Sequence, residues 1–207
     1  MESLKALLYS ELDQLELMTD QFEIEKKEVY GDWLAQTYYF VCHSTKLLAL
    51  ASARFETDRK EFHYRFAEHI KEERGHELMA LNDLERLGFS IEQFDELPQT
   101  KAFYQSQYFW TTQKNPISFY GYILCLEVFA IRGAVRLYNK VCEAFGPESA
   151  VFLRVHTKED IHHVEEAFRH LQHLHSDEFS QIEENMRLST YLYKEMYKAI
   201  AHRRAAS

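Results

Sequence analysis

The 207-residue sequence has few of the residues that end or bend regular secondary structure, with only 6 glycines and 3 prolines. Because Gly and Pro dominate tight turns, their scarcity disfavours a fold built from many short strands. No segment alternates polar and apolar residues over a useful length, so we predict no β-strands. Many Leu, Glu, Lys and Ala residues instead favour long helices.

The chain also lacks paired cysteines, clustered basic residues and long apolar runs. Cys42, Cys125 and Cys142 are far apart in the sequence, which indicates reduced thiols in a cytoplasmic protein. The net charge of −9 disfavours nucleic acid as a partner, because phosphate binding needs clustered Lys and Arg. The amphipathic, acidic N-terminus differs from a signal peptide, and no run of about 20 apolar residues exists. We therefore expect neither nucleic-acid nor membrane binding.

Hydrophobic periodicity and capping signals predict a single all-α domain, residues 1–207, with seven or eight helices. Ser90 and Gln93 resemble a capping box, and Asn115 followed by Pro116 is typical of a helix start. Asp58 is a further candidate cap. The expected long helices cover about 3–18, 32–56, 58–88, 99–112, 116–145, 148–174 and 177–202.

The segment "HTKEDIHHVEEAFRHL", residues 156–171, contains the first candidate metal ligands. Positions i, i+4 and i+7 of an α-helix fall within a band of about 60°. His156, Asp160 and His163 therefore point the same way, whereas His162 points nearly opposite. A solvated polar face is the alternative interpretation of this helix.

Glu127 is the second candidate, because it interrupts the apolar segment "YILCLEVFAI". An isolated ionised carboxylate in such surroundings is costly, so it is normally paired, protonated or bound to a metal. A salt bridge to Arg132 or another basic residue is the alternative.

The segment "HIKEERGHEL" supplies the third candidate group. Glu73 and His76 form an E-x-x-H pair, a spacing by which helical bundles give a metal pair one carboxylate and one imidazole. Glu72 is an equally reachable donor, and His69 lies on the same side one turn earlier. A solvent-exposed face is again the alternative.

Three carboxylates and three imidazoles from three long helices suit a pair of divalent metals with open positions for oxygen and substrate. The absence of cysteine from the set argues against structural zinc or an iron–sulfur centre. A second pattern uses Glu159 and His162 as another E-x-x-H, but it needs a further Glu that residues 32–55 do not offer on an apolar face. The predicted ligands are Glu73, His76, Glu127, His156, Asp160 and His163.

These motifs resemble the heme-oxygenase-like di-metal oxidases, an all-helical superfamily that includes thiaminase II (TenA), PqqC and the Chlamydia protein associating with death domains. The resemblance covers roughly residues 30–200. It is strongest at "HTKEDIHHVEEA", "YGYILCLEVFAIRGA" and "EERGHELMALNDLERLG".

The resemblance implies a TenA/PqqC-like fold with a non-heme site of two irons, or manganese and iron, that uses O2 to oxidise a small organic molecule. It implies the same six ligands, with Glu72 or Glu73 as the first carboxylate, and outer groups such as Tyr or Arg132 that orient them. Several relatives have six residues between the first Glu and its His, and "EERGH" is shorter. A homodimer is also expected, as helical domains of this kind often form dimers.

Other functions on this fold require other residues. A TenA-like hydrolase needs a cysteine nucleophile, for which Cys125 is the candidate. A true heme oxygenase needs an axial histidine, for which His43 is the candidate, although we favour a core histidine bonded to a neighbouring tyrosine. A non-enzymatic helical regulatory or interaction protein is the third alternative. No residue in the sequence selects a substrate.

Overall fold

The computed structural model describes residues 2–205, without the side chains of Glu159 and His173. Within these residues the chain forms ten α-helices and five short 3-10 helices, with no strand. The helices are α1 (Glu2–Asp20), α2 (Lys27–Val41), α3 (Ser44–Ser52), α4 (Lys60–Glu73), α5 (His76–Arg86), α6 (Pro98–Gln113), α7 (Tyr120–Arg132), α8 (Ala134–Phe145), α9 (Val151–His170) and α10 (Ser176–Ala205). The 3-10 helices are η1 (Thr57–Arg59), η2 (Ile91–Gln93), η3 (Pro116–Phe119), η4 (Pro147–Ser149) and η5 (Leu171–His173).

The all-α prediction is confirmed, but the count of seven or eight helices is too low because three predicted long helices are broken. The predicted helix 32–56 starts five residues earlier, at Lys27, and divides into α2 and α3. Gly75, with φ of 92°, separates α4 from α5. The left-handed conformation at Gly75 cannot continue a right-handed helix.

A second glycine allows the bend of 51° between the helical segment 116–132 and α8. A Cβ atom at Gly133 would lie 2.3 Å from the Phe129 ring, so only glycine lets the ring pack against this backbone. This bent pair reaches the length and apolar composition of a membrane span, whereas no single helix within residues 2–205 does.

The predicted capping signals have mixed outcomes. The capping box of Ser90 and Gln93 is present, and the Asn115 side chain accepts a hydrogen bond from the Ile117 amide at 3.0 Å. Asp58 is not a cap, because it lies inside η1 and α4 begins after Arg59. The chain therefore enters α4 through a 3-10 turn.

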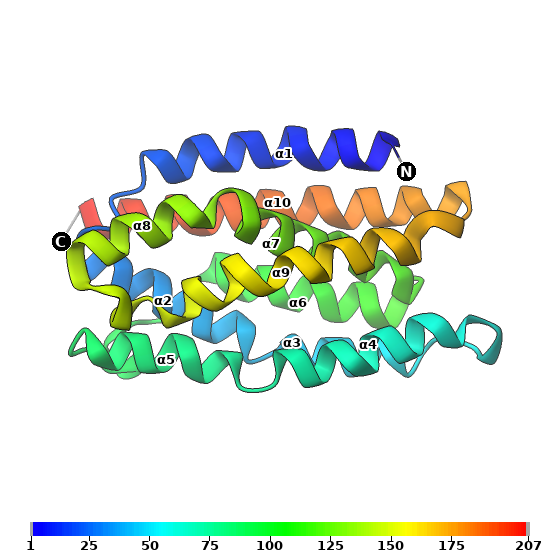
Figure 1. Ribbon diagram of the computed structural model, residues 1–207, viewed down its shortest axis with the longest axis horizontal. Coiled ribbons are helices and arrows are strands. Elements are labelled where there is room, and N and C mark those ends of the chain that lie inside the picture. The colour runs from blue at the N-terminus through cyan, green and yellow to red at the C-terminus, as the bar shows by residue number, and fades with distance from the viewer. Residues whose placement is uncertain (1, 206–207) are drawn as a thin grey trace.

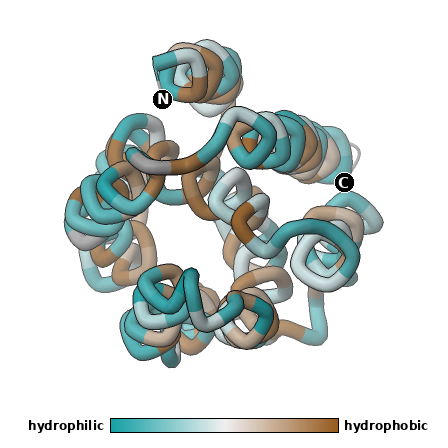
Figure 2. The backbone as a smooth tube through the Cα atoms, turned by 90° about the vertical axis from the view of Figure 1, so that its right-hand side faces the viewer, coloured by the Kyte–Doolittle hydropathy of each residue, from teal (hydrophilic) through white to brown (hydrophobic). Residues whose placement is uncertain are grey.

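The helices run along the long axis of the molecule and enclose an aromatic-rich core (Figure 1). α7 packs against both α9 and α10, and α5 packs against α2 and α9. Seen end on, α1 lies outside the other helices (Figure 2). Its buried stripe of Leu4, Leu8, Leu12 and Leu15 faces α10, α7 and α8. The central position of α7 brings its middle turn close to α4 and α9.

Candidate metal centre

All six predicted ligands converge in the interior between α4, α5, α7 and α9. Asp160 and His163 are buried, like Glu127 and His76, while Glu73 and His156 are partly buried. The donor atoms form two groups, and within each group they lie within 4.8 Å of one another. The solvent-face interpretation of the His156–His163 and Glu73–His76 motifs is therefore wrong.

The first group consists of Glu73, His76 and His156. His76 Nδ1 lies 3.5 Å from Glu73 Oε2, and the rings of His76 and His156 are 4.8 Å apart at right angles. Glu73 ends α4 and His76 begins α5, so the E-x-x-H pair does not lie on one continuous helix. The turn through Gly75 nevertheless brings the two side chains together.

The second group consists of His69, Glu72 and His163. His163 Nε2 lies 3.3 Å from Glu72 Oε2, and the His69 and His163 rings are 5.0 Å apart. Glu72 and Glu73 are thus not alternatives, because each belongs to a different group. α4 contributes to both groups through adjacent residues.

Asp160 lies against both groups, and Glu127 lies against the second. Glu127 Oε1 is 3.1 Å from His69 Nε2 and 3.6 Å from His163 Nδ1. Asp160 approaches His156 at 3.3 Å and His163 at 3.5 Å. Both carboxylates could therefore add a donor to a cation held by a neighbouring group.

Arg132 takes no part in this centre. Its guanidinium binds Asp13 at 2.6 Å and Glu16 at 2.8 Å on α1. Arg132 is therefore neither the partner of Glu127 nor an orienting group of this centre, and the basic residue beside Glu127 is His69 at 3.1 Å.

The acids and imidazoles perturb one another because they share a desolvated space. Burial disfavours the His69 imidazolium, but the carboxylates of Glu127 and Glu73, at 3.1 and 3.5 Å, outweigh this cost and raise the pKa of His69 to about 10. Burial also opposes ionisation of Glu73, yet the imidazoles of His69 and His76, each 3.5 Å away, hold its pKa well below the usual range. Burial raises the pKa of Glu127, because His69 compensates its charge only in part.

Several buried donor atoms of the centre lack a hydrogen bond among the described residues. They include both carboxylate oxygens of Glu127, Nε2 of His156, and Nδ1 of His76 and His163. Buried polar atoms are normally paired, so a concentration of unpaired lone pairs indicates a missing ligand. Mixed carboxylate and imidazole donors without thiolates suit iron or manganese.

His69 is the ligand candidate that the sequence prediction left out. It lies seven positions before His76, the spacing at which the resemblance places the first carboxylate. An imidazole therefore occupies that place here. The seven-position spacing between His69 and His76 is visible in the sequence, but the E-x-x-H motif favoured Glu73 as the donor.

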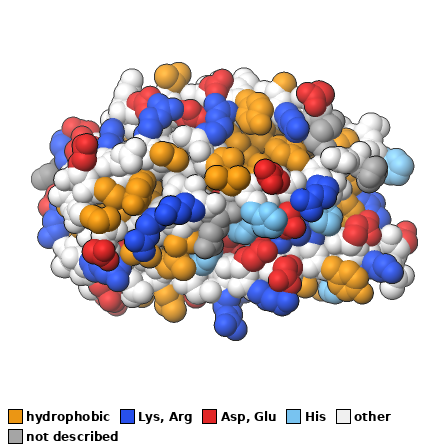
Figure 3. Space-filling view, in the orientation of Figure 1, with side chains coloured by type: hydrophobic (Ala, Val, Ile, Leu, Met, Phe, Trp, Pro, Cys, Tyr) orange, Lys and Arg blue, Asp and Glu red, His pale blue; other side chains and the backbone are white. Residues whose placement is uncertain are grey.

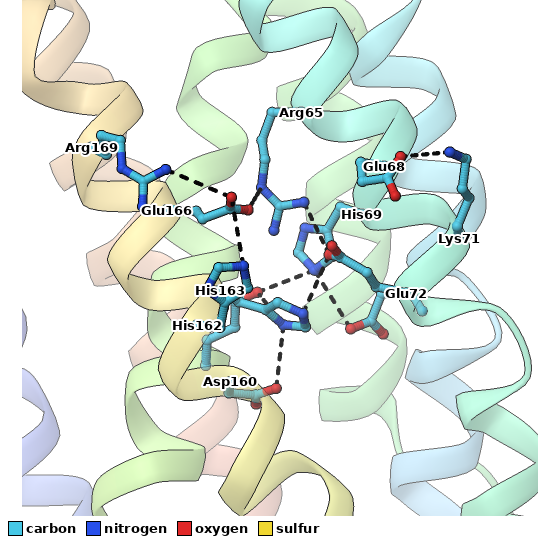
Figure 4. A network of polar contacts seen from close by, with 12 residues as sticks. Arg65, Glu68, His69, Lys71, Glu72, Asp160, His162, His163, Glu166 and Arg169 are labelled. Carbon is cyan, nitrogen blue, oxygen red and sulfur yellow. Dashed lines mark hydrogen bonds and ion pairs between the residues drawn. The ribbon is translucent and has the colours of Figure 1, made fainter.

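Arg65 is the second functional residue that the sequence prediction missed. Its guanidinium lies 3.0 Å from Glu72 Oε2 and 3.0 Å from Glu166 Oε2, and the residue is buried between α4 and α9 (Figure 4). Arg65 therefore fixes the same Glu72 oxygen that His163 approaches. Histidine, acidic and basic side chains also gather on the surface along α9 (Figure 3).

The alternative pattern with Glu159 and His162 finds no support at His162. His162 is exposed, and its nearest acidic partner is Glu166 at 3.7 Å. The Glu159 side chain lies outside the described part of the structure.

A cavity of about 90 Å³ adjoins the candidate ligands. His69, Glu73, Glu127, His156 and Asp160 form its polar end. The remaining walls are mainly aliphatic and aromatic, as in many small-molecule sites. The arrangement therefore combines a candidate metal pair with an apolar chamber.

The residues for the alternative functions lie elsewhere. Cys125 is fully buried, burial raises the pKa of its thiol, and it does not line the cavity. A neutral thiol is a weak nucleophile. His43 Nδ1 is hydrogen-bonded to the Tyr108 hydroxyl at 2.8 Å, as predicted for a core histidine.

The chain is thus an all-helical protein whose interior carries a carboxylate–imidazole cluster that could hold metal ions. The chain belongs to the iron-containing redox enzyme family, whose sequence profile matches residues 31–192. This finding confirms the resemblance to heme-oxygenase-like proteins.

Two solved structures share the fold. A domain of unknown function with a heme oxygenase-like fold from Shewanella denitrificans OS217 has a TM-score of 0.77 and 22% identity, covering 99% of this chain and 91% of that one. A TenA homolog from Pseudomonas syringae pv. tomato DC3000 has a TM-score of 0.75 and 11% identity, covering 96% and 93%. No curated protein matches the sequence.

Proposed function

We propose that the protein is a non-heme oxidase or oxygenase with two divalent metals, iron or manganese with iron, that uses O2 to oxidise a small organic molecule. The observation that carries this proposal is the pair of neighbouring ligand groups, with Asp160 against both and Glu127 against the second. Membership of the iron-containing redox enzyme family supports it.

Each cation has its own set of protein donors in this proposal. Glu73, His76 and His156 would hold the first, and His69, Glu72 and His163 would hold the second. When bound, the metals supply the electrons that reduce O2, which closed-shell organic molecules do not react with directly.

The protein residues supply positioning and exclusion of water. Arg65 holds the Glu72 carboxylate against His163 before any cation binds. Trp33, Phe129 and Phe152 line the cavity beside the ligands, so a bound molecule lies in a water-poor environment.

Metal analysis after anaerobic Fe(II) loading tests the proposal, followed by O2 exposure with optical monitoring. We expect about two irons per chain and an absorption change on exposure to O2. His156→Ala and Glu127→Ala should each reduce loading, because each removes donors from a buried centre. His162→Ala is the matched control on the same helix, since this side chain is exposed.

Unchanged metal content in both His156→Ala and Glu127→Ala would overturn the site assignment. A wild-type protein that takes up no Fe(II) under these conditions would overturn the proposed function. The homodimer and the cytoplasmic location stay predictions.

A further inference from the structure

The first turn of α9 lies directly before the three candidate ligands of that helix. Backbone amides in the first turn of an α-helix have no acceptor within the helix, so another group has to supply one. The N-cap residue often does so, but the N-cap of α9 is Ala150, whose methyl side chain is no acceptor. The buried amide of Phe152 therefore takes its partner from another helix.

That partner is Asp83 of α5. Its Oδ2 atom accepts a hydrogen bond of 2.8 Å from the Phe152 amide, and the residue is fully buried. Its Oδ1 atom lies 3.0 Å from the guanidinium of Arg86, which is exposed. One oxygen of this carboxylate thus attaches the start of α9 to α5, while the other oxygen pairs with a cation at the surface.

The same two helices bring together part of the first ligand group. His76 begins α5, seven positions before Asp83, and its ring lies 4.8 Å from the ring of His156. Phe152 precedes His156 by four positions on α9, and their rings are 4.4 Å apart. Positions i and i+7 of an α-helix share a face, as do i and i+4. Each helix therefore uses one face for both the Asp83–Phe152 hydrogen bond and the contact between the two histidines.

The two ends of the ligand-bearing part of α9 have different attachments. At its start, the Tyr30 hydroxyl of α2 adds a hydrogen bond of 2.7 Å to the carbonyl of Ser149, in η4. Beyond the ligands, Glu166 pairs with Arg65 of α4 at 3.0 Å. The first ligand group therefore depends on the attachment at the start of α9, and the second lies beside the attachment through Arg65.

On these observations, and resting on the proposed metal centre, we propose that Asp83 is a positioning residue of the first cation site. It acts through the backbone of α9, because its hydrogen bond fixes where this helix begins relative to α5. That position places His156 opposite His76. Without the acceptor, His156 loses its fixed position, whereas His163 keeps the support of the Arg65–Glu166 pair. The expected effect is a loss of affinity at one of the two sites.

Mn(II) binding to the full-length protein tests the proposal. Titration followed by the electron paramagnetic resonance signal of free Mn(II) gives the number of bound cations and their affinities. Anomalous diffraction at the manganese edge shows which site is filled. Asp83→Ala should weaken the first site by at least about tenfold, the usual effect of removing a residue that orients metal ligands. The second site should keep its wild-type affinity.

Three further variants separate positioning from stability. Arg86→Ala removes the ion pair with Asp83 but leaves the hydrogen bond to Phe152, so both sites should keep their affinity. Asp32→Ala removes another fully buried carboxylate and should leave Mn(II) binding unchanged in the folded protein. Asp83→Asn keeps an oxygen acceptor at the same reach and should restore most of the affinity of the first site.

Asp83→Glu carries the test where Asp83→Ala does not fold. Glutamate keeps the carboxylate but is one methylene longer, and a fully buried position accommodates it only by a shift of its neighbours. The start of α9 should move, so the first site should weaken although the charge is retained. A residue that served only to neutralise Arg86 would tolerate this change without any effect on metal binding.

Wild-type affinity at the first site in folded Asp83→Ala overturns the inference, as does the same result in Asp83→Glu where the alanine variant does not fold. Equal weakening of both sites also overturns it, and so does a loss in Arg86→Ala as large as that in Asp83→Ala. In each of these cases the wild-type protein still binds two cations and the proposed function stands. Wild-type protein that takes up no metal would instead remove the proposed function together with this inference.

Discussion

Two buried polar clusters in this protein differ in how completely their polar atoms are hydrogen-bonded. At one end of the bundle, fully buried Asp32 binds Arg204 at 2.9 Å, Arg203 at 3.3 Å and Gln36 at 3.1 Å. Gln36 in turn accepts hydrogen bonds from the Leu97 amide and the Thr100 hydroxyl. In the metal centre, by contrast, both oxygens of Glu127 lack a hydrogen bond among the described residues.

This difference separates a structural cluster from a functional one. Both contain buried charge, so burial alone does not identify a site. The Asp32 cluster is completed by its own chain, whereas the donors of the metal centre converge on one another without being satisfied. Incomplete pairing is therefore the property that indicates an external ligand.

The largest expected effect comes from breaking the completed cluster. Asp32→Ala removes the common partner of Arg203 and Arg204 and should lower the free energy of unfolding by about 3 kcal/mol. Denaturant unfolding measures this loss, and Fe(II) loading of the folded variant should stay at the wild-type level. A stable variant that had lost its metal would contradict the division between the two clusters.

The corresponding change in the metal centre should have the opposite sign in metal-free protein. Burial raises the pKa of Glu127, so its charge destabilises the fold at neutral pH. Glu127→Gln should therefore raise the free energy of unfolding of the metal-free protein at neutral pH, while it lowers metal uptake. Thermal unfolding with and without Mn(II) checks both parts. If Glu127→Gln instead destabilised the metal-free protein as much as Asp32→Ala does, the distinction between the two clusters would be contradicted.

Metal uptake should depend on pH because the cation must displace protons. The pKa of His69 is raised to about 10, and those of His156 and His163 are raised by neighbouring carboxylates despite burial. Affinity for Mn(II) should therefore increase between pH 6 and 8, by about tenfold per pH unit for each proton released. Calorimetry in buffers of different ionisation enthalpy counts the protons.

The same shift has a stability consequence in the metal-free protein. The contribution of His69 is fully present below its unfolded pKa near 6.5 and is lost as pH rises towards about 10. Mn(II) uptake that does not change with pH would show that these imidazoles are already neutral in the metal-free protein.

The smallest effect concerns the break between α4 and α5. Gly75→Ala puts a side chain at φ of 92° and should cost about 1 kcal/mol. Gly146→Ala is a matched control, since φ is 83° and the added methyl group likewise meets nothing within 4 Å. Only Gly75→Ala should also weaken metal binding, because it displaces His76. Equal metal affinity in the two variants would exclude that coupling.

The sequence predicted the helical class and the convergence of six donors, because helical periodicity and a carboxylate in an apolar segment are local signals. It did not predict His69 as a donor, since an E-x-x-H pair on one continuous helix leaves no need for it. The structure breaks that helix at Gly75 and uses both Glu72 and Glu73. Arg65 was also missed, because its partner Glu166 is distant in sequence and becomes adjacent only through packing.

Adjacent residues of α4 contribute to different ligand groups: Glu72 to one and Glu73 to the other. Consecutive Cα atoms are separated by about 3.8 Å in any trans chain. A movement of α4 relative to α9 would therefore displace a donor of each group at the same time.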